Sequence, residues 1–334
     1  MAQRILEPGQ IETLASRSIP RIRLPDRTHL FSRRATRLRK LASTAAIGDY
    51  LQFIAALVDA QHAAMGRLAL APASVAAPSD AAAPPDAAAP PDTAGLASPS
   101  GPRMPPLHPS IWPRAPHWRN TLEQLCEALA GPSFPPAVGA TIVKLRRATP
   151  AWVEAQADAV LATHAQGVDV AAAPFVMAAL QVHWGAASSA LKANEIKALD
   201  MPGVCPVCGT LPVASLVCAN SPYQGYRYLH CALCATEWHM VRVQCSQCGA
   251  SGKSIGYHSM ERAAPDEDAS AEDLPATRAE TCEECRGYRK ILYQEKDPGV
   301  EPVADDLASL GLDLLLGREG YTRASGNPLL WQAA

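Results

Sequence analysis

The chain has 334 residues, enough for one large domain or two ordinary ones, and a formal net charge of −2. That balance does not favour a polyanion-binding protein, which needs clustered positive charge. No apolar run approaches the length of a bilayer-spanning helix, and Met1 to Arg34 lacks the apolar segment of a secretory signal. We therefore expect a soluble, cytoplasmic protein with no direct membrane insertion.

The N-terminal stretch divides into an arm and a helical region. Residues 1–25 are polar and contain three prolines, which predicts an irregular arm. Between residues 26 and 70, apolar side chains recur at steps of three and four, so we expect two helices, the second opening at Asp49. The first 50 residues carry ten Lys and Arg and four Asp and Glu, which we interpret as solvated helix faces.

Residues 71–116 are interpreted as an Ala/Pro-rich linker or insertion. Ten of the thirty prolines lie within residues 71–106, together with a tandem repeat of Ala-Ala-Ala-Pro-Pro-Asp. Proline fixes φ and removes an amide donor, and no alternation of polar and apolar residues would bury a face here. We expect this stretch to be extended and disordered, with no bearing on activity.

Helical patterns return over residues 117–200. Thr149 followed by Pro150 is typical of a helix N-cap and first turn, and a longer apolar helix is predicted from Pro174 to Ala198. Cys126 and His183 fall on apolar faces, where we expect them to be packed rather than ligating. The region up to residue 200 therefore predicts an all-helical domain with one interruption.

Four Cys-x-x-Cys pairs dominate the 81 residues from Cys205 to Cys285. Two thiolates two residues apart bind one metal ion, and a second pair completes a tetrahedral site. The first two pairs are separated by 22 residues, the spacing of a zinc ribbon, and the last two by 33. We predict two metal ions, iron or zinc, each with four thiolates. The ligands would be Cys205, Cys208, Cys231, Cys234, Cys245, Cys248, Cys282 and Cys285.

The cysteine pairs define two ribbons, over residues 201–244 and 245–300. Strands are expected at Val213–Val217, Tyr226–His230, Trp238–Val243 and Tyr288–Gln294, and the acidic residues 261–284 are expected to form a loop or short helix. A single amphipathic helix, Val303 to Leu316, is predicted within residues 301–334. The fold class is thus α+β: an N-terminal all-helical domain, tandem rubredoxin-like or zinc-ribbon β modules, and a C-terminal helix.

The turn after each pair depends on the residue that follows it. Gly209 and Gly249 can adopt the positive φ of a metal knuckle, whereas Ala235 and Arg286 occupy the same place in the other two pairs and predict less ideal turns. The remaining cysteines, Cys126 and Cys218, are expected to pack as small buried residues.

Several chemistries remain open for these thiolates. Zinc would be a structural staple, iron could carry one electron, and thiol–disulfide exchange is a third option although no thioredoxin-like βαβ unit is present. His230 or His239 could replace a thiol as ligand.

A nucleic-acid ribbon is disfavoured because residues 201–300 carry nine Lys and Arg against twelve Asp and Glu. We expect no enzyme activity, because sulfur-saturated metal leaves no position for water and no other catalytic motif occurs.

Several motifs together resemble one known family, the FdhE-type accessory proteins of formate dehydrogenase. The similarity is dense over about residues 200–330 and sparser upstream. The matching motifs include Cys205-Pro-Val-Cys-Gly209, Tyr228-Leu-His-Cys-Ala-Leu-Cys234, Thr236-Glu-Trp-His239, Val241-Arg-Val-Gln-Cys-Ser-Gln-Cys248, Lys290-Ile-Leu-Tyr-Gln-Glu-Lys-Asp-Pro298, Val303-Ala-Asp-Asp-Leu-Ala-Ser309, Glu319-Gly-Tyr321 and Asn327-Pro328.

The resemblance implies a cytoplasmic, non-catalytic maturation factor needed for active respiratory formate dehydrogenase, a molybdenum enzyme. It would bind the immature catalytic subunit and carry the eight paired cysteines as metal ligands. The alternative is a rubredoxin-like iron redox protein or sensor acting on the same enzyme. Asp305 and Asp306 would be either a partner-contact patch or acidic residues favoured at a helix start.

Overall fold

The computed structural model describes residues 19–68, 104–131, 133–162, 167–220, 223–260 and 274–331. Within these residues, helices and one mixed sheet form an α+β fold, which confirms the predicted class. The expected irregular arm up to residue 18, most of the expected linker and residues 261–273 of the acidic stretch lie outside the described residues.

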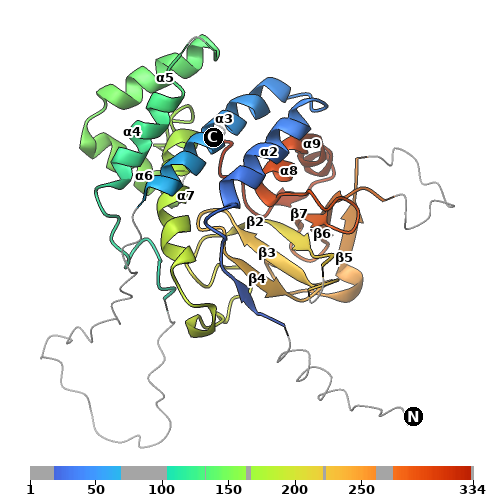
Figure 1. The fold of residues 1–334 in the computed structure, drawn as a ribbon. Helices are drawn as coiled ribbons and strands as arrows, with labels where there is room; N and C mark the ends of the chain where they lie inside the picture. The colour runs from blue at the N-terminus through green and yellow to red at the C-terminus, as the bar shows by residue number, and fades with distance from the viewer. Residues whose placement is uncertain are drawn as a thin grey trace, which may run out of the picture.

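Six α-helices lie in the described part of the N-terminal half (Figure 1). The most deeply buried is α7, which packs against α3, α4 and α6 and is apolar on nearly all sides. All-round apolar character is what a helix at the centre of a domain requires. The six are α2 (Leu30–Ala42), α3 (Gly48–Arg67), α4 (Trp118–Ala128), α5 (Pro136–Arg147), α6 (Pro150–Leu161) and α7 (Ala173–Ser189).

The predicted helix starts are reproduced more closely than the ends. Thr149 caps α6 as expected, because its hydroxyl accepts a hydrogen bond from the Trp152 amide at 3.3 Å. The prediction of one long helix to Ala198 was wrong. α7 ends at Ser189 and is followed by a separate 3-10 turn, Ala193–Glu195, in which all three residues are exposed. Without a buried face, helical propensity alone does not extend α7.

The strands form one sheet in the order β1-β4-β3-β2-β7-β6-β5, with β8 beside β7. The first cysteine module supplies β2 to β4 and the second supplies β5 to β7, and the parallel pairing of β2 with β7 joins them. The two ribbons therefore share one sheet. The strands are β1 (Ile22–Arg23), β2 (Pro212–Val217), β3 (Arg227–Cys231), β4 (Glu237–Met240), β5 (Ile255–His258), β6 (Thr277–Cys282), β7 (Gly287–Tyr293) and β8 (Thr322–Arg323).

Two strands replace structure that was predicted to be irregular. β1 lies in the expected arm, where its pairing with β4 satisfies the backbone. β6 lies in the expected acidic loop or helix and runs between β5 and β7. The charge of Glu280 suggested a surface position, but its carboxylate is buried against the guanidinium of Arg227, with Oε1 at 2.7 Å from Nη2.

The predicted C-terminal helix is two helices, α8 (Pro302–Ala308) and α9 (Leu310–Arg318). The break falls at Ser309, whose hydroxyl donates to the Asp305 carbonyl at 2.7 Å and competes with the helical pattern. The break also changes which leucines are covered. Leu314 was expected on the apolar face but is 68% exposed, whereas Leu312 is buried.

Part of the predicted linker belongs to the core. Leu107 is buried, and its amide donates to the Val207 carbonyl at 2.8 Å. Its own carbonyl accepts from the indole nitrogen of Trp184 at 2.9 Å. Leu107 therefore links α7 to the first cysteine pair, so this part of the expected linker is packed.

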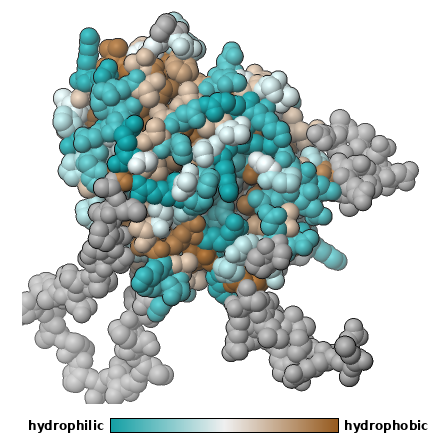
Figure 2. Space-filling model, viewed as in Figure 1, coloured by the Kyte–Doolittle hydropathy of each residue, from teal (hydrophilic) through white to brown (hydrophobic). Residues whose placement is uncertain are grey.

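The described surface is mainly hydrophilic in the view of Figure 2, with scattered hydrophobic patches. None of the described helices has both the length and the apolar character needed to cross a membrane.

Candidate metal centres

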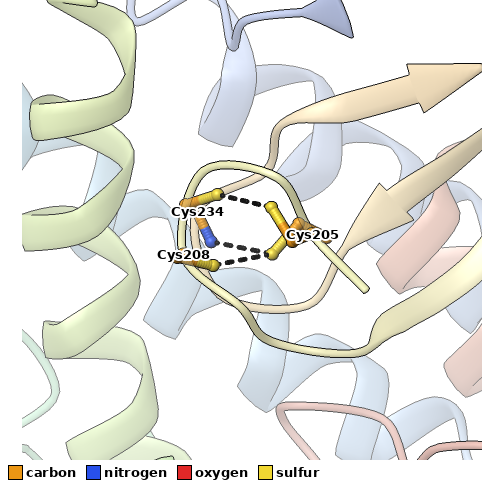
Figure 3. Close-up of side chains that lie close together, drawn as sticks. Cys205, Cys208 and Cys234 are labelled. Atoms are coloured by element: carbon orange, nitrogen blue, oxygen red, sulfur yellow. Dashed lines mark hydrogen bonds between the residues drawn. The ribbon is translucent and has the colours of Figure 1, made fainter. Parts of the chain in front are cut away.

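The first four cysteines come together beside α7 (Figure 3). Cys205 and Cys208 precede β2, and Cys231 and Cys234 follow from the end of β3. The Sγ atoms of Cys205 and Cys234 are 3.6 Å apart, and those of Cys208 and Cys231 are 3.3 Å apart. All four side chains are buried, and Figure 3 shows those of the three labelled cysteines directed toward one another.

The second four cysteines meet at the same edge of the sheet as the first, because one cysteine pair of each group directly precedes β2 or β7 and these two strands run parallel. The Sγ atoms of Cys245 and Cys285 are 3.7 Å apart, and those of Cys248 and Cys282 are 3.6 Å apart. Cys245 and Cys282 are buried, whereas Cys248 and Cys285 are exposed. This group is therefore open to solvent on one side.

The sulfur geometry fits a four-coordinate metal ion. Zinc–sulfur bonds of about 2.3 Å in a tetrahedron place the sulfurs about 3.8 Å apart, close to the observed separations. A disulfide would bring two of them to about 2.0 Å, and all ten cysteines are free thiols. In each group the four Sγ atoms lie within 4.8 Å of one another, so both groups could hold a metal ion.

The turns that carry the cysteines favour thiolates. The amides of Leu233 and Cys234 both lie 3.4 Å from the Cys231 sulfur, and the amide of Gln247 lies 3.4 Å from that of Cys245. Amides directed at a sulfur stabilise its negative charge and therefore its ability to bind metal.

The four knuckles share one backbone conformation. Gly209 and Gly249 have φ of 78° and 80°, as expected. Ala235 and Arg286 adopt φ of 57° and 54° although each carries a Cβ. These two knuckles keep the turn at a conformational cost of about 1 kcal/mol or more each, in line with the prediction of less ideal turns.

The helical domain packs against the first centre through α7. Gln181 Nε2 donates to the Ala232 carbonyl at 2.8 Å, and the Ser188 hydroxyl donates to the Cys234 carbonyl at 2.9 Å. Both donors lie on α7, so this helix is anchored directly on the second pair of cysteines. In Figure 3 the helix runs alongside the knuckle.

A buried cation lies behind the second centre. Arg289 is fully inside the protein, where its Nε donates to the Ser246 hydroxyl at 2.9 Å while Nη2 has no partner among the described residues. Burial, together with the neighbouring Arg227, lowers the pKa of Arg289 to about 9. Positive charge next to Ser246, between two cysteines of a pair, favours an anionic thiolate cluster there.

Neither histidine proposed as a substitute ligand joins a sulfur group. His230 Nδ1 lies 3.1 Å from the Glu237 carboxylate, and the His239 ring packs edge-on against Tyr226 and Tyr228. The two remaining cysteines are buried as expected. The Cys218 sulfur also accepts a hydrogen bond from Arg23 at 3.1 Å.

Of the two alternatives for Asp305 and Asp306, burial excludes the partner-contact patch, whereas Asp305 does lie in the first turn of α8. They are 3% and 0% exposed. Asp306 Oδ2 accepts from Asn327 Nδ2 at 2.7 Å. Burial opposes ionisation of Asp306, but Lys290 and Arg323 outweigh it and lower its pKa. Both acids are internal partners of cations that no short motif identified.

Sequence patterns also missed the residues that surround the centres. In the sequence, Arg227 and Arg289 look like ordinary strand residues. Gln181 looks like a single polar residue within an apolar helix. For Gln181 and Arg289 the signal is a long polar side chain with a buried residue on either side.

Family comparison decides what kind of protein carries these centres. Three family models match consecutive parts of the chain: "FdhE, N-terminal" over residues 19–200, "FdhE, central domain" over 204–242 and "FdhE, C-terminal domain" over 243–330. The chain belongs to the FdhE family. The family resemblance of the sequence motifs is thereby confirmed.

Individual relatives cover nearly the whole chain. Protein FdhE of Escherichia coli is 39% identical over 326 residues, which are 97% of this chain and 96% of that protein. The FdhE homolog of Cronobacter sakazakii is 37% identical over 335 residues, 99% of this chain and 98% of its own. The crystal structure of the FdhE protein from Pseudomonas aeruginosa matches with a TM-score of 0.74 at 36% identity, covering 94% of this chain and 100% of that one.

Proposed function

We propose that this FdhE-family chain is a non-catalytic accessory protein required for active respiratory molybdenum formate dehydrogenase. It acts in the cytoplasm and binds the catalytic subunit of that enzyme, without nucleic acid and without entering a membrane. Family membership supports this role. The single structural observation in its favour is the pair of four-cysteine groups on one sheet, one of them anchored to α7. Bound metal would make them a broad, rigid platform.

The metal part of the proposal assigns eight ligands. Each group of four thiolates holds one ion, iron or zinc, and the ion supplies a cross-link between two knuckles. A structural site of this type contributes roughly 10–16 kcal/mol near neutral pH, more than the net stability of most domains. Because sulfur fills the coordination sphere, no position is left for a reacting water.

Co-purification tests the partner. An affinity-tagged chain, produced together with the formate dehydrogenase catalytic subunit, should retain that subunit through washing at physiological salt. The matched control is the Cys205→Ser variant, which should lose metal and the subunit together. Absence of the subunit from a metal-replete wild-type preparation would contradict the proposed binding.

A second candidate function is favoured by the exposure of Cys248 and Cys285. If the second group holds iron, its open side would allow one-electron exchange with a partner, and the protein would be a redox protein or sensor for the same enzyme. Visible absorption of a ferric tetrathiolate that dithionite bleaches would support this function. A colourless protein with two zinc ions would exclude it.

A further inference from the structure

The residues within each Cys-x-x-Cys pair differ sharply between the two centres. In the first centre, the residues just before the second cysteine of each pair are Val207 and Leu233, which are 0% and 2% exposed. In the second centre the same positions hold Gln247 and Glu284, and both are exposed. The first centre is thus sealed by its own knuckles, while the second turns its knuckles to water.

Outside the knuckles, the helical domain covers the first centre. Among the described residues, the C-terminal segment contacts the last knuckle of the second centre, where Arg286 Nη2 donates to the Glu319 carbonyl at 2.7 Å. The carbonyl of Val207 accepts from the amide of Leu107, and α7 donates to the carbonyls of Ala232 and Cys234. Gly209 leaves no room for a Cβ, which would meet the His108 ring at 2.4 Å. Reaching these sulfurs from solvent requires α7 and the 104–112 segment to separate from the sheet.

At the second centre the sulfurs meet solvent directly. Cys248 and Cys285 are exposed, and the side chain of Gln247 lies against the Cys285 sulfur, with Oε1 at 3.8 Å from Sγ. Gln247 itself is exposed and belongs to a surface turn. It therefore shields Cys285 without burying it.

The backbone that enters the second centre is strained. Val243, two residues before Cys245, has φ of 56°, an outlier for a β-branched residue, and is 42% exposed. Arg227 holds the segment by donating to the carbonyls of Val241 and Gln244 at 3.3 and 2.9 Å. Strain of this kind lowers the cost of local opening at the site that it borders.

We propose that the two centres are chemically unequal. The second is the exchangeable, thiol-reactive centre, where Cys248 and Cys285 meet competing soft metal ions, chelators and soft electrophiles. The first exchanges its metal ion slowly and links the sheet to the helical domain. Thiolate reactivity requires access as well as charge, and the exposed pair alone has access without local unfolding. This inference rests on the proposed metal ligation and not on the formate dehydrogenase partner.

Chelation kinetics provide the first test. The intact wild-type chain is first analysed for metal and then mixed with excess EDTA, and the metal that stays with the protein is followed with time. We expect one ion per chain to leave at least about tenfold faster than the other, because only the slow one requires separation of α7. Two ions that leave with one rate constant would overturn the inference while leaving the ligation intact. Protein without metal would overturn both.

Alkylation mapping assigns the fast phase to residues. With iodoacetamide, a carbon–sulfur bond forms at the thiolate as the carbon–iodine bond breaks and iodide leaves with the electron pair. Mass spectrometry of the native wild-type protein should show Cys248 and Cys285 modified first, in step with loss of the fast ion. Earlier or equal modification of Cys205 or Cys234 would contradict the proposed inequality.

A variant of Gln247 tests whether its side chain protects the Cys285 sulfur from solvent. Gln247→Ala removes the amide beside Cys285 from an exposed turn and should speed the fast phase several-fold without changing the slow one. Gln124→Ala, which removes an α4 amide that pairs with Arg67 and not with a cysteine knuckle, should change neither phase. An unchanged fast phase, or a change confined to the slow one, would contradict the role given to Gln247.

Discussion

Arg37 in α2 and Asp305 in α8 form a two-pronged ion pair across 268 residues of sequence. Arg37 Nε and Nη2 donate to the two carboxylate oxygens of Asp305 at 2.9 and 2.5 Å, and both side chains are less than a tenth exposed. One turn earlier, Arg34 Nε donates to Glu301 at 2.8 Å. These pairs attach the first described helix to the C-terminal helices and, through α8, to β2 and β7.

Removing one partner of this pair should destabilise the whole fold. Arg37→Met leaves the Asp305 carboxylate buried without its cation, which typically costs about 3–5 kcal/mol. Urea unfolding followed by circular dichroism would measure the loss. The matched control is Arg39→Met on the same helix, whose partner Asp59 is half exposed and whose loss should cost well under 1 kcal/mol. Equal effects of the two variants would contradict the role assigned to the buried pair.

A buried histidine should make the protein sensitive to mild acid. His183 packs among Trp112, Trp184 and His117, and Nε2 has no hydrogen-bond partner in the described part of the chain. Burial, with the nearby His117 and Arg114, lowers the pKa of His183 to about 4.

The sign of the effect follows from proton uptake. Between pH 6.5 and 4 the unfolded chain protonates this imidazole and the folded chain does not. The free energy of unfolding therefore decreases as the pH is lowered through this range, by up to roughly 3 kcal/mol. We expect His183→Phe to flatten the decline in melting temperature between pH 7 and 5. His62→Gln, at an exposed position of α3, should leave the wild-type slope unchanged. A slope that survives in His183→Phe would contradict the assignment.

Introducing a glycine at one knuckle should raise the free energy of unfolding, and removing a glycine from another should lower it. Ala235→Gly relieves the left-handed conformation of Ala235 and should raise stability by about 1 kcal/mol. Gly209→Ala should destabilise strongly, because its φ is positive and the new Cβ would collide with His108. Gly249→Ala has a similar φ of 80° and nothing within 4 Å of the new Cβ, so it should cost less. Thermal unfolding of the three variants measures the order, and equal losses for the two glycines would exclude the His108 contact as the cause.

The cysteine groups could be anticipated from sequence because their chemistry is local. Two cysteines with two residues between them can share an ion in almost any fold, and the glycine after the first and third pairs marks the turn. The helix starts were predictable for the same reason, since Thr149 and Pro150 act on their own backbone.

What sequence patterns missed depends on distant partners. The strand β6 was hidden because Glu280 looks like a surface residue until Arg227, 53 residues away, is placed beside it. The joining of both modules in one sheet rests on the parallel pairing of Ser215 with Ile291, which no local period encodes. The unequal exposure of the two centres has a local part, the apolar or polar residue before the second cysteine of each pair, and a tertiary part, the packing of α7 on the first centre.

Metal content tests the central claim most directly. Element analysis of the anaerobically purified wild-type chain should find two ions of iron or zinc per chain, and Cys205→Ser should lose the ion of the first centre. Retention of two ions by Cys205→Ser would contradict its assignment as a ligand. A folded wild-type chain with no bound metal would contradict the account as a whole.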